Sequence, residues 1–214
     1  MNIARTFVAG CFVFVLSACD SVYYGAMEQI GFQKSDLMRS SVEDAMEAQA
    51  DAKEEFQSAF ERFSSVVTVE RSELRDTYDT LNDAYEDADS KARRVTERIE
   101  EVEDVSEDLF AEWEQEIGEI SSADLRRSSQ RQLSSSRKSY AELMRAMRRA
   151  ESRMAPVLTA FKDQVLFLKH NLNAQAIASL KSELGDIETD VAQLIREMES
   201  AIEKSQAYIE ELEG

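Results

Sequence analysis

The sequence predicts an all-α fold, an elongated antiparallel coiled-coil or four-helix bundle from which a helical hairpin projects. Three observations lead to this prediction. Only six glycines and one proline occur in 214 residues. Charged residues make up 32% and hydrophobic residues 43% of the chain. Apolar residues also recur at alternating spacings of three and four in four long stretches, which keeps one stripe of each helix facing a partner.

The first helix is expected over about 36–66, with Ser35 or Ser41 as its N-cap. Eight of the nine residues in its stripe are apolar. The stripe consists of Met38, Val42, Ala45, Gln49, Ala52, Phe56, Ala59, Phe63 and Val66. Its alanines permit close approach of a neighbouring helix.

The second helix is expected over about 71–118, after a β-branched cluster and with Ser72 as a possible N-cap. All nine residues of its stripe are apolar: Leu74, Tyr78, Leu81, Tyr85, Ala88, Ala92, Val95, Ile99 and Val102. Gly118 and the two serines that follow predict a turn near residue 120.

The third and fourth helices are expected over about 123–170 and 174–212, with two asparagines marking the turn between them. Pro156 predicts a kink, because the stripe continues past it without a change of phase. The third stripe is Tyr140, Leu143, Met147, Ala150, Met154, Val157 and Phe161. The fourth is Ile177, Leu180, Leu184, Ile187, Val191, Leu194 and Met198.

Short turns predict that consecutive helices are antiparallel neighbours in one domain, 36–214. The turns near 68 and 172 then share one end, and the turn near 120 lies at the other. At about 1.5 Å per residue the first helix, at roughly 45 Å, is too short to cover the central pair. Residues about 105–138 are therefore expected to project as a thinner hairpin, with Leu109 and Trp113 on its seam.

Four consecutive apolar residues, 165–168, predict where the folding core lies. A helix that is apolar all round is normally buried on every side. We therefore expect Phe167 and Leu168 to pack against residues 60–78 and 172–180. Leu133, in the serine-rich hairpin, is expected to contribute far less to stability.

Charge is unevenly distributed along the chain. Residues 70–119 contain 19 acidic and 6 basic residues, whereas residues 124–153 contain 9 basic and 3 acidic ones. Pairing between helices, which fixes antiparallel register, is one interpretation. The alternative is contact with a phosphate-rich surface such as lipid headgroups, or with a protein partner. The residues that carry this alternative are Arg126, Arg127, Arg131, Arg137 and Lys138.

The sequence contains no pattern typical of catalysis. Its one histidine, His170, has no second histidine near it, and phosphate-binding loops and nucleophile motifs do not occur. We therefore predict a non-enzymatic protein with no metal site, no cofactor and no small-molecule substrate. A net charge of −18 also argues against nucleic acid as a partner.

The first 18 residues are typical of a secretory signal peptide. Arg5 is followed by ten apolar or small residues, too few to span a bilayer as a helix. Leu16-Ser17-Ala18-Cys19 resembles the lipobox of bacterial lipoproteins. That resemblance implies cleavage before Cys19, a diacylglyceryl group on its thiol, and acylation of the palmitate type on the new amino terminus. Residues 19–35 are then the lipidated terminus and a tether.

Three further stretches resemble an uncharacterised family of Gram-negative lipoproteins that is catalogued only as a domain of unknown function. They are "VEDAMEAQADAKEEFQSAFERFSSVV", "LRRSSQRQL" and "DQVLFLKHNLNAQAIASL". The resemblance covers nearly the whole chain and implies a periplasmic, lipid-anchored, helical protein without assigned activity. Asp20 resembles the signal that retains lipoproteins in the inner membrane, so the inner membrane is favoured over the outer.

These observations predict a non-catalytic helical scaffold, spacer or adaptor for envelope proteins. Its partners are the membrane, through the N-terminal lipid, and an envelope protein or a second copy of the chain. The alternative is a membrane-associating or membrane-shaping module that uses the basic face of the third helix.

Overall fold

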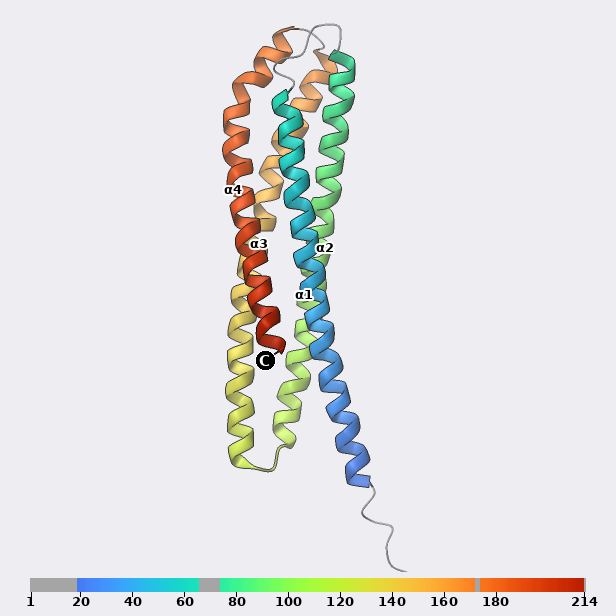
Figure 1. Ribbon diagram of the computed structural model, residues 1–214, viewed down its shortest axis with the longest axis vertical. Helices are drawn as coiled ribbons and strands as arrows, with labels where there is room; N and C mark the ends of the chain where they lie inside the picture. Colours follow the sequence, from blue (N-terminus) through green and yellow to red (C-terminus); the bar gives the residue numbers. More distant parts are fainter. Residues whose placement is uncertain (1–18, 66–73, 172–173, 214) are drawn as a thin grey trace, which may run out of the picture.

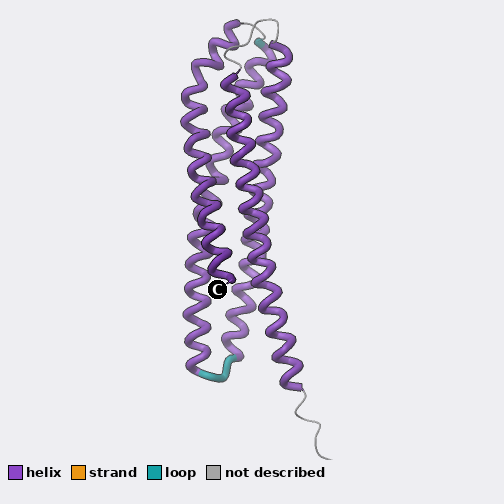
Figure 2. The backbone as a smooth tube through the Cα atoms, viewed as in Figure 1, coloured by secondary structure: helices purple, strands orange, loops and turns teal. Residues whose placement is uncertain are grey.

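The computed structural model describes residues 19–65, 74–171 and 174–213, with side chains from 34–65, 75–171 and 180–212 (Figure 1). Four long helices run side by side: α1 (Cys19–Ser65), α2 (Leu74–Glu119), α3 (Ala123–His170) and α4 (Ala174–Glu213). No strand occurs among these residues (Figure 2). The predicted all-α bundle is confirmed.

Each helix packs against two neighbours in a closed arrangement. α1 contacts α2 and α4, and α3 contacts the same two helices. The chain reverses direction at every connection, so neighbours are antiparallel (Figure 1). α1 ends and α4 begins at one end of the bundle, and residues 120–122 turn the chain at the other, as the sequence predicts.

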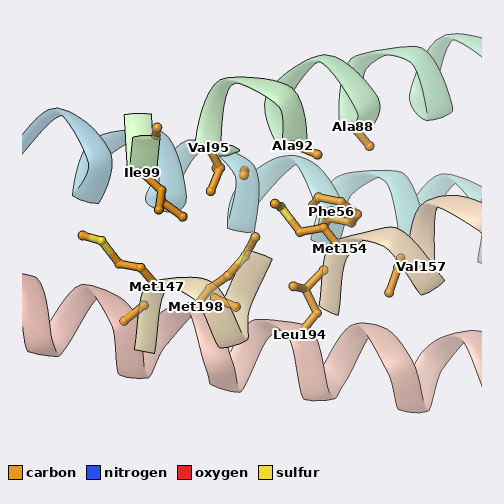
Figure 3. Packing of buried hydrophobic residues seen from close by; sticks show 14 of the residues in the cluster. Phe56, Ala88, Ala92, Val95, Ile99, Met147, Met154, Val157, Leu194 and Met198 are labelled. Atoms are coloured by element: carbon orange, nitrogen blue, oxygen red, sulfur yellow. The ribbon is translucent and has the colours of Figure 1, made fainter. Parts of the chain in front are cut away.

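The apolar stripes form the core between the helices. Every member of the third stripe from Leu143 to Phe161 is buried. Figure 3 shows side chains of α2, such as Val95 and Ile99, facing Met147 of α3 and Met198 of α4. Towards the end of the bundle where α1 ends, Phe63 stacks on Phe161 with ring centroids 4.4 Å apart. The alternating spacing of the sequence is thus the pattern that buries one side of each helix.

Gln49 is an exception within this core. It occupies a stripe position of α1 and is fully buried, and neither polar atom of its side-chain amide has a hydrogen-bond partner among the described residues. Burial of an unpaired polar group costs about 1–3 kcal/mol. The first stripe therefore includes a position that lowers the stability of the bundle.

The first helix is longer than predicted. α1 begins at Cys19 rather than near residue 36, so the segment 19–35 that we assigned to a tether is helical. The helix that stops short is α4. Its last described turns place Tyr208 beside Tyr140, and α4 ends at Glu213, well before the α2–α3 turn (Figure 1). The hairpin therefore extends beyond α4 but not beyond α1, whose Lys34 pairs with Glu112 of α2 and whose start lies at the same end as the α2–α3 turn, so the expected projection past the first helix is wrong (Figure 1).

The run at 165–168 is only half buried, contrary to our prediction. Val165 and Leu168 are buried, but Leu166 is 45% and Phe167 38% exposed. The two buried residues continue the stripe from Phe161, whereas the other two face away from α2 and α4. The expectation that Phe167 is a core residue is therefore wrong. Two groups of its expected neighbours, 66–74 and 172–179, lie outside the residues whose side chains the structure describes.

This difference gives a first prediction. Leu168→Ala should lower the free energy of unfolding by about 2–5 kcal/mol, because it empties a fully buried position. Phe167→Ala, one residue away, is the matched control. The Phe167 side chain is 38% exposed, so its removal should lower the free energy of unfolding much less. Thermal and denaturant unfolding of the purified protein measure both. Equal losses of unfolding free energy in the two variants would contradict the assignment of Leu168 to the core and Phe167 to the surface.

Candidate functional site

The turn at the hairpin tip is held by side chains on its α3 side. Ser122 is the N-cap of α3, and its Oγ accepts a hydrogen bond from the backbone N–H of Leu125. The guanidinium of Arg126 donates two hydrogen bonds, of 3.0 and 2.8 Å, to the carbonyl of Ile120. Carbonyls just past the end of a helix lack a helical partner. Arg126 therefore closes the turn between α2 and α3.

A small core of its own holds the hairpin together. Phe110, Ile117 and Leu133 are buried against one another, with Trp113 packed beside them. The indole Nε1 of Trp113 donates a 2.9 Å hydrogen bond to the Oγ of Ser129. A serine of the serine-rich segment thus forms a hydrogen bond between α3 and α2.

Two residues of the hairpin differ from our expectations. Leu109 belongs to the main core rather than to the hairpin seam. Leu133 is only 2% exposed, so the serine-rich segment still contributes a buried side chain.

The five predicted basic residues differ in what they contact. Arg127 forms an ion pair with Asp124 in its own helix. The Nη2 of Arg137 lies 2.8 Å from the Oε2 of Glu114 in α2, and its guanidinium lies 5.6 Å from the centroid of the Phe110 ring. With Arg126, these two are engaged within the hairpin.

The other two, Arg131 and Lys138, are exposed and have no ion pair or hydrogen bond to any described residue. They are the members of the predicted set whose charge is available to another molecule.

Pairing between helices accounts for part of the charge segregation. Arg148 of α3 binds both carboxylate oxygens of Glu103 in α2, and this hydrogen bonding raises the pKa of the arginine. Lys91 of α2 lies 2.7 Å from Asp51 of α1. Such pairs flank the buried stripes, where they favour the observed register.

A hollow lies on the surface of α3 near the hairpin tip, and it is open rather than an enclosed pocket. It is lined by Arg126, Arg127, Gln130, Arg131 and Ser134. All five are exposed and all belong to α3, so the hollow has no opposite wall. It suits a broad charged surface better than a small molecule, which normally needs a concave and mostly apolar site.

The sequence analysis missed one member of the basic set. Arg145 is exposed, and no described residue pairs with it. It lies seven residues beyond Lys138, which itself lies seven beyond Arg131. This spacing is visible in the sequence, but its significance depends on knowing which arginines pair elsewhere.

Cys19 and Asp20 form the first turn of α1, with their side chains outside the described set. His170 is exposed in the last turn of α3. Within the described residues, no group of three His, Cys, Asp or Glu side chains is arranged to hold a metal ion. None of the described helices combines the length and hydropathy needed to cross a membrane.

An aromatic cluster lies where α4 ends. The rings of Phe110 and Tyr140 meet edge to face at 5.4 Å, and Tyr208 lies 6.5 Å beyond Tyr140. Tyr208 is 2% exposed, and its hydroxyl lies near Ser136 of α3 but forms no well-aligned hydrogen bond to a described residue. Burial raises the pKa of Tyr208 to about 12, because the phenolate is poorly solvated there.

Comparison with known proteins identifies a family but no activity. A family model described as a protein of unknown function, DUF2959, matches residues 23–212. No curated protein and no solved structure matches the chain. The matched range covers α2 and α3, nearly all of α4, and α1 from residue 23 onwards. It begins after Cys19 and Asp20, so it carries no information about these two residues.

The buried tyrosine predicts a loss of stability at high pH. The folded-state pKa of Tyr208, about 12, lies above the ordinary value of 10. The neutral phenol is therefore favoured by folding, and the stability linked to it is fully present below pH 10 and is lost as the pH rises towards 12. Over that range the wild type should lose about 2–3 kcal/mol more unfolding free energy than Tyr208→Phe. Near neutral pH the Phe variant should be about as stable as the wild type, since the removed hydroxyl has no well-aligned hydrogen bond to a described residue.

Denaturant unfolding at several pH values measures this difference. Tyr85→Phe, at a partly exposed position of α2, is the control for loss of one tyrosine. Identical pH dependence of the wild type and Tyr208→Phe would contradict the prediction.

Proposed function

We propose that this chain, which belongs to the DUF2959 family of proteins of unknown function, is a lipid-anchored helical scaffold on the periplasmic side of a bacterial membrane. In this role it acts as a spacer or adaptor for envelope proteins and performs no reaction. The non-catalytic part of the proposal rests on the sequence, in which no catalytic motif occurs.

One observation carries the proposal. α1 runs without a break from Cys19, the predicted lipidation site, to Ser65 at the other end of the bundle. Its 47 residues correspond to about 70 Å of helix. An acyl group on Cys19 would therefore be joined to a rod by continuous helix and not by a flexible segment. Such a connection suits a protein that holds a partner at a defined distance from the membrane.

The direction of the rod follows from the position of Cys19. The start of α1 and the hairpin turn at 120–122 lie at the same end of the molecule (Figure 1). With a lipid on Cys19, the hairpin tip is the end near the membrane. The opposite end, where Leu166 and Phe167 are exposed, is the distal one.

A membrane-binding role for the basic face is the second candidate. It is favoured by Arg131 and Lys138, which are exposed and form no ion pair with a described residue. Both belong to the N-terminal part of α3, and α3 begins at the end of the molecule that holds Cys19 (Figure 1). The acidic residues of α2 oppose it, since Glu112, Glu114 and Glu119 lie in the same hairpin and repel anionic lipid. We therefore favour the scaffold.

The anchor is tested by Cys19→Ser, which removes the thiol that would carry the diacylglyceryl group. The variant is expected to remain an unprocessed precursor, detected by its slower migration and by the absence of fatty-acid label. Asp20→Ser is the matched control, which should be lipidated normally and shift from the inner to the outer membrane. Normal maturation and acylation of the Cys19→Ser variant would contradict the proposal.

The adaptor role is tested by photo-crosslinking in intact cells. A photoreactive residue is placed at Gln130, in the hairpin, or at Leu166, at the distal end. Glu188, exposed midway along α4, is the control position. At least one end is expected to give an adduct with an envelope protein or a second copy, in higher yield than position 188. If neither end gives such an adduct, the adaptor role is wrong.

A further inference from the structure

The turn at the hairpin tip is uncharged, and an exposed leucine follows it. The residues 120–123 carry no charge. Asp124, the first charged residue of α3, is paired with Arg127. Leu125 is 64% exposed, the largest exposed fraction among the large hydrophobic residues whose side chains the structure describes. A single exposed leucine needs no explanation by itself, so its surroundings and its place in the molecule decide what it means.

Arginines lie close to this leucine on α3. Arg127 and Arg131 line the open hollow together with Arg126 and two uncharged polar residues. Arg131 is exposed and has no ion pair or hydrogen bond to any described residue. An apolar side chain flanked by arginines is typical of helices that bind at the interface between lipid and water.

The two helices of the hairpin direct their side chains differently. In an α-helix every Cα–Cβ bond is tilted towards the N-terminus of the helix. α3 begins at the tip, so Leu125, Arg127 and Arg131 lean towards the tip. α2 ends at the tip, so the exposed Glu119 leans away from it. The basic side chains therefore extend towards the space beyond the tip, whereas the acidic one is drawn back.

The other acidic residues in this part of α2 are largely compensated. The Oε2 of Glu112 lies 2.8 Å from the Nζ of Lys34 in α1. Glu114 is paired with Arg137 at the same distance. Glu116 is half-buried, and its burial, followed by the charge of Glu112, raises its pKa. The repulsion that α2 exerts on an anionic surface is therefore weaker at the tip than its composition indicates.

The tip lies at the end of the molecule that holds the predicted lipidation site. α1 begins at Cys19, and its start and the turn at 120–122 reach similar levels along the bundle (Figure 1). An acyl group on Cys19 would therefore bring the turn to the surface of the same membrane. Leu125 lies ~3 Å and Arg131 ~12 Å along α3 from its first residue, so both are near that surface.

We propose that the hairpin tip rests on the membrane that holds the anchor, with Leu125 in the headgroup layer and Arg127 and Arg131 facing lipid phosphates. A guanidinium binds phosphate oxygens through a planar fork of N–H donors. This inference rests on the proposed lipid anchor and adds a second contact to it. Two contacts on separate helices hold the rod upright, whereas a lipid on α1 alone leaves it free to tilt.

The basic residues of α3 do not suit a rod that lies flat on the membrane. Arg131, Lys138 and Arg145 follow one another at intervals of seven. Arg145 is two residues from both Leu143 and Met147, which are buried, so this line points away from the core. α1 and α3 are diagonal, since each packs on α2 and α4. A membrane along the outer side of α3 would therefore lie across the bundle from the anchored helix.

The experiment measures which part of α3 touches lipid. The mature lipidated protein is reconstituted in vesicles of phosphatidylethanolamine and phosphatidylglycerol. A fluorophore is attached to Ala123→Cys at the tip or to Ser152→Cys on the outer side of α3, both exposed positions. The predicted removal of Cys11 and acylation of Cys19 leave no other free thiol. Lipids with a quencher on the headgroup should quench the label at 123 strongly and the label at 152 weakly.

Paired variants assign the contact to residues, and time-resolved quenching gives the ratio of membrane-bound to free tip. Leu125→Ser should lower this ratio about tenfold, because it removes the burial of a leucine. Leu37→Ser is its control, since Leu37 is 57% exposed but lies ~27 Å along α1 from Cys19. Arg131→Gln should lower the ratio about fivefold, the effect of one cation near an anionic surface. Lys138→Gln is its control, because Lys138 lies ~10 Å farther from the membrane, beyond the Debye length of about 8 Å.

Three results would overturn the tip contact while the anchor stands. Equal quenching at 123 and 152 would mean that the rod lies flat. Absence of quenching at both positions in an acylated protein would mean that the tip stays clear of the membrane. Equal effects of each variant and its control would remove Leu125 and Arg131 from the contact. A protein without fatty acid would overturn the anchor and this inference with it, and fatty-acid labelling distinguishes that failure from the other three.

Discussion

The structure depends on burying one apolar stripe from each of four helices at the same time. A single helix of this composition cannot remove its stripe from water alone, and two helices cover only part of it. Closing the ring of α1, α2, α3 and α4 gives every stripe two neighbours. The hydrophobic gain from this burial offsets the entropy lost in ordering long helices. The antiparallel arrangement follows from it, because the connections are too short to return the chain along the bundle.

The same constraint determines where charge can lie. With one side of each helix buried, the charged residues occupy the remaining sides, and those nearest the core pair with the adjacent helix. Arg148 with Glu103 and Lys91 with Asp51 are such pairs. Residues farther from the core cannot reach a neighbour in the same chain. Arg131, Lys138 and Arg145 of α3 belong to this remainder, which is why they are exposed and have no ion pair to a described residue.

Two positions show that the bundle is not optimised for stability alone. Gln49 and Tyr208 bury polar atoms that have no hydrogen-bond partner among the described residues. Tyr208 lies where α4 ends, beyond which α2 and α3 continue beside α1 and form the separate cluster around Phe110. For Gln49, which lies inside the main core, the geometry offers no compensating contact.

The sequence by itself determined the helices and their inward sides, because spacings of three and four are a local property. The third helix has the predicted bounds, and its stripe from Leu143 to Phe161 is buried as expected. Only the tertiary structure decided which charges pair and which apolar residues stay exposed. Phe167 and Leu168 are adjacent and both apolar, but only Leu168 faces a neighbouring helix. Arg126 and Arg131 are both exposed, but only Arg126 reaches a free carbonyl across the turn. The first outcome depends on helices far away in the chain and the second on the geometry of the α2–α3 turn, and the spacing of apolar residues encodes neither.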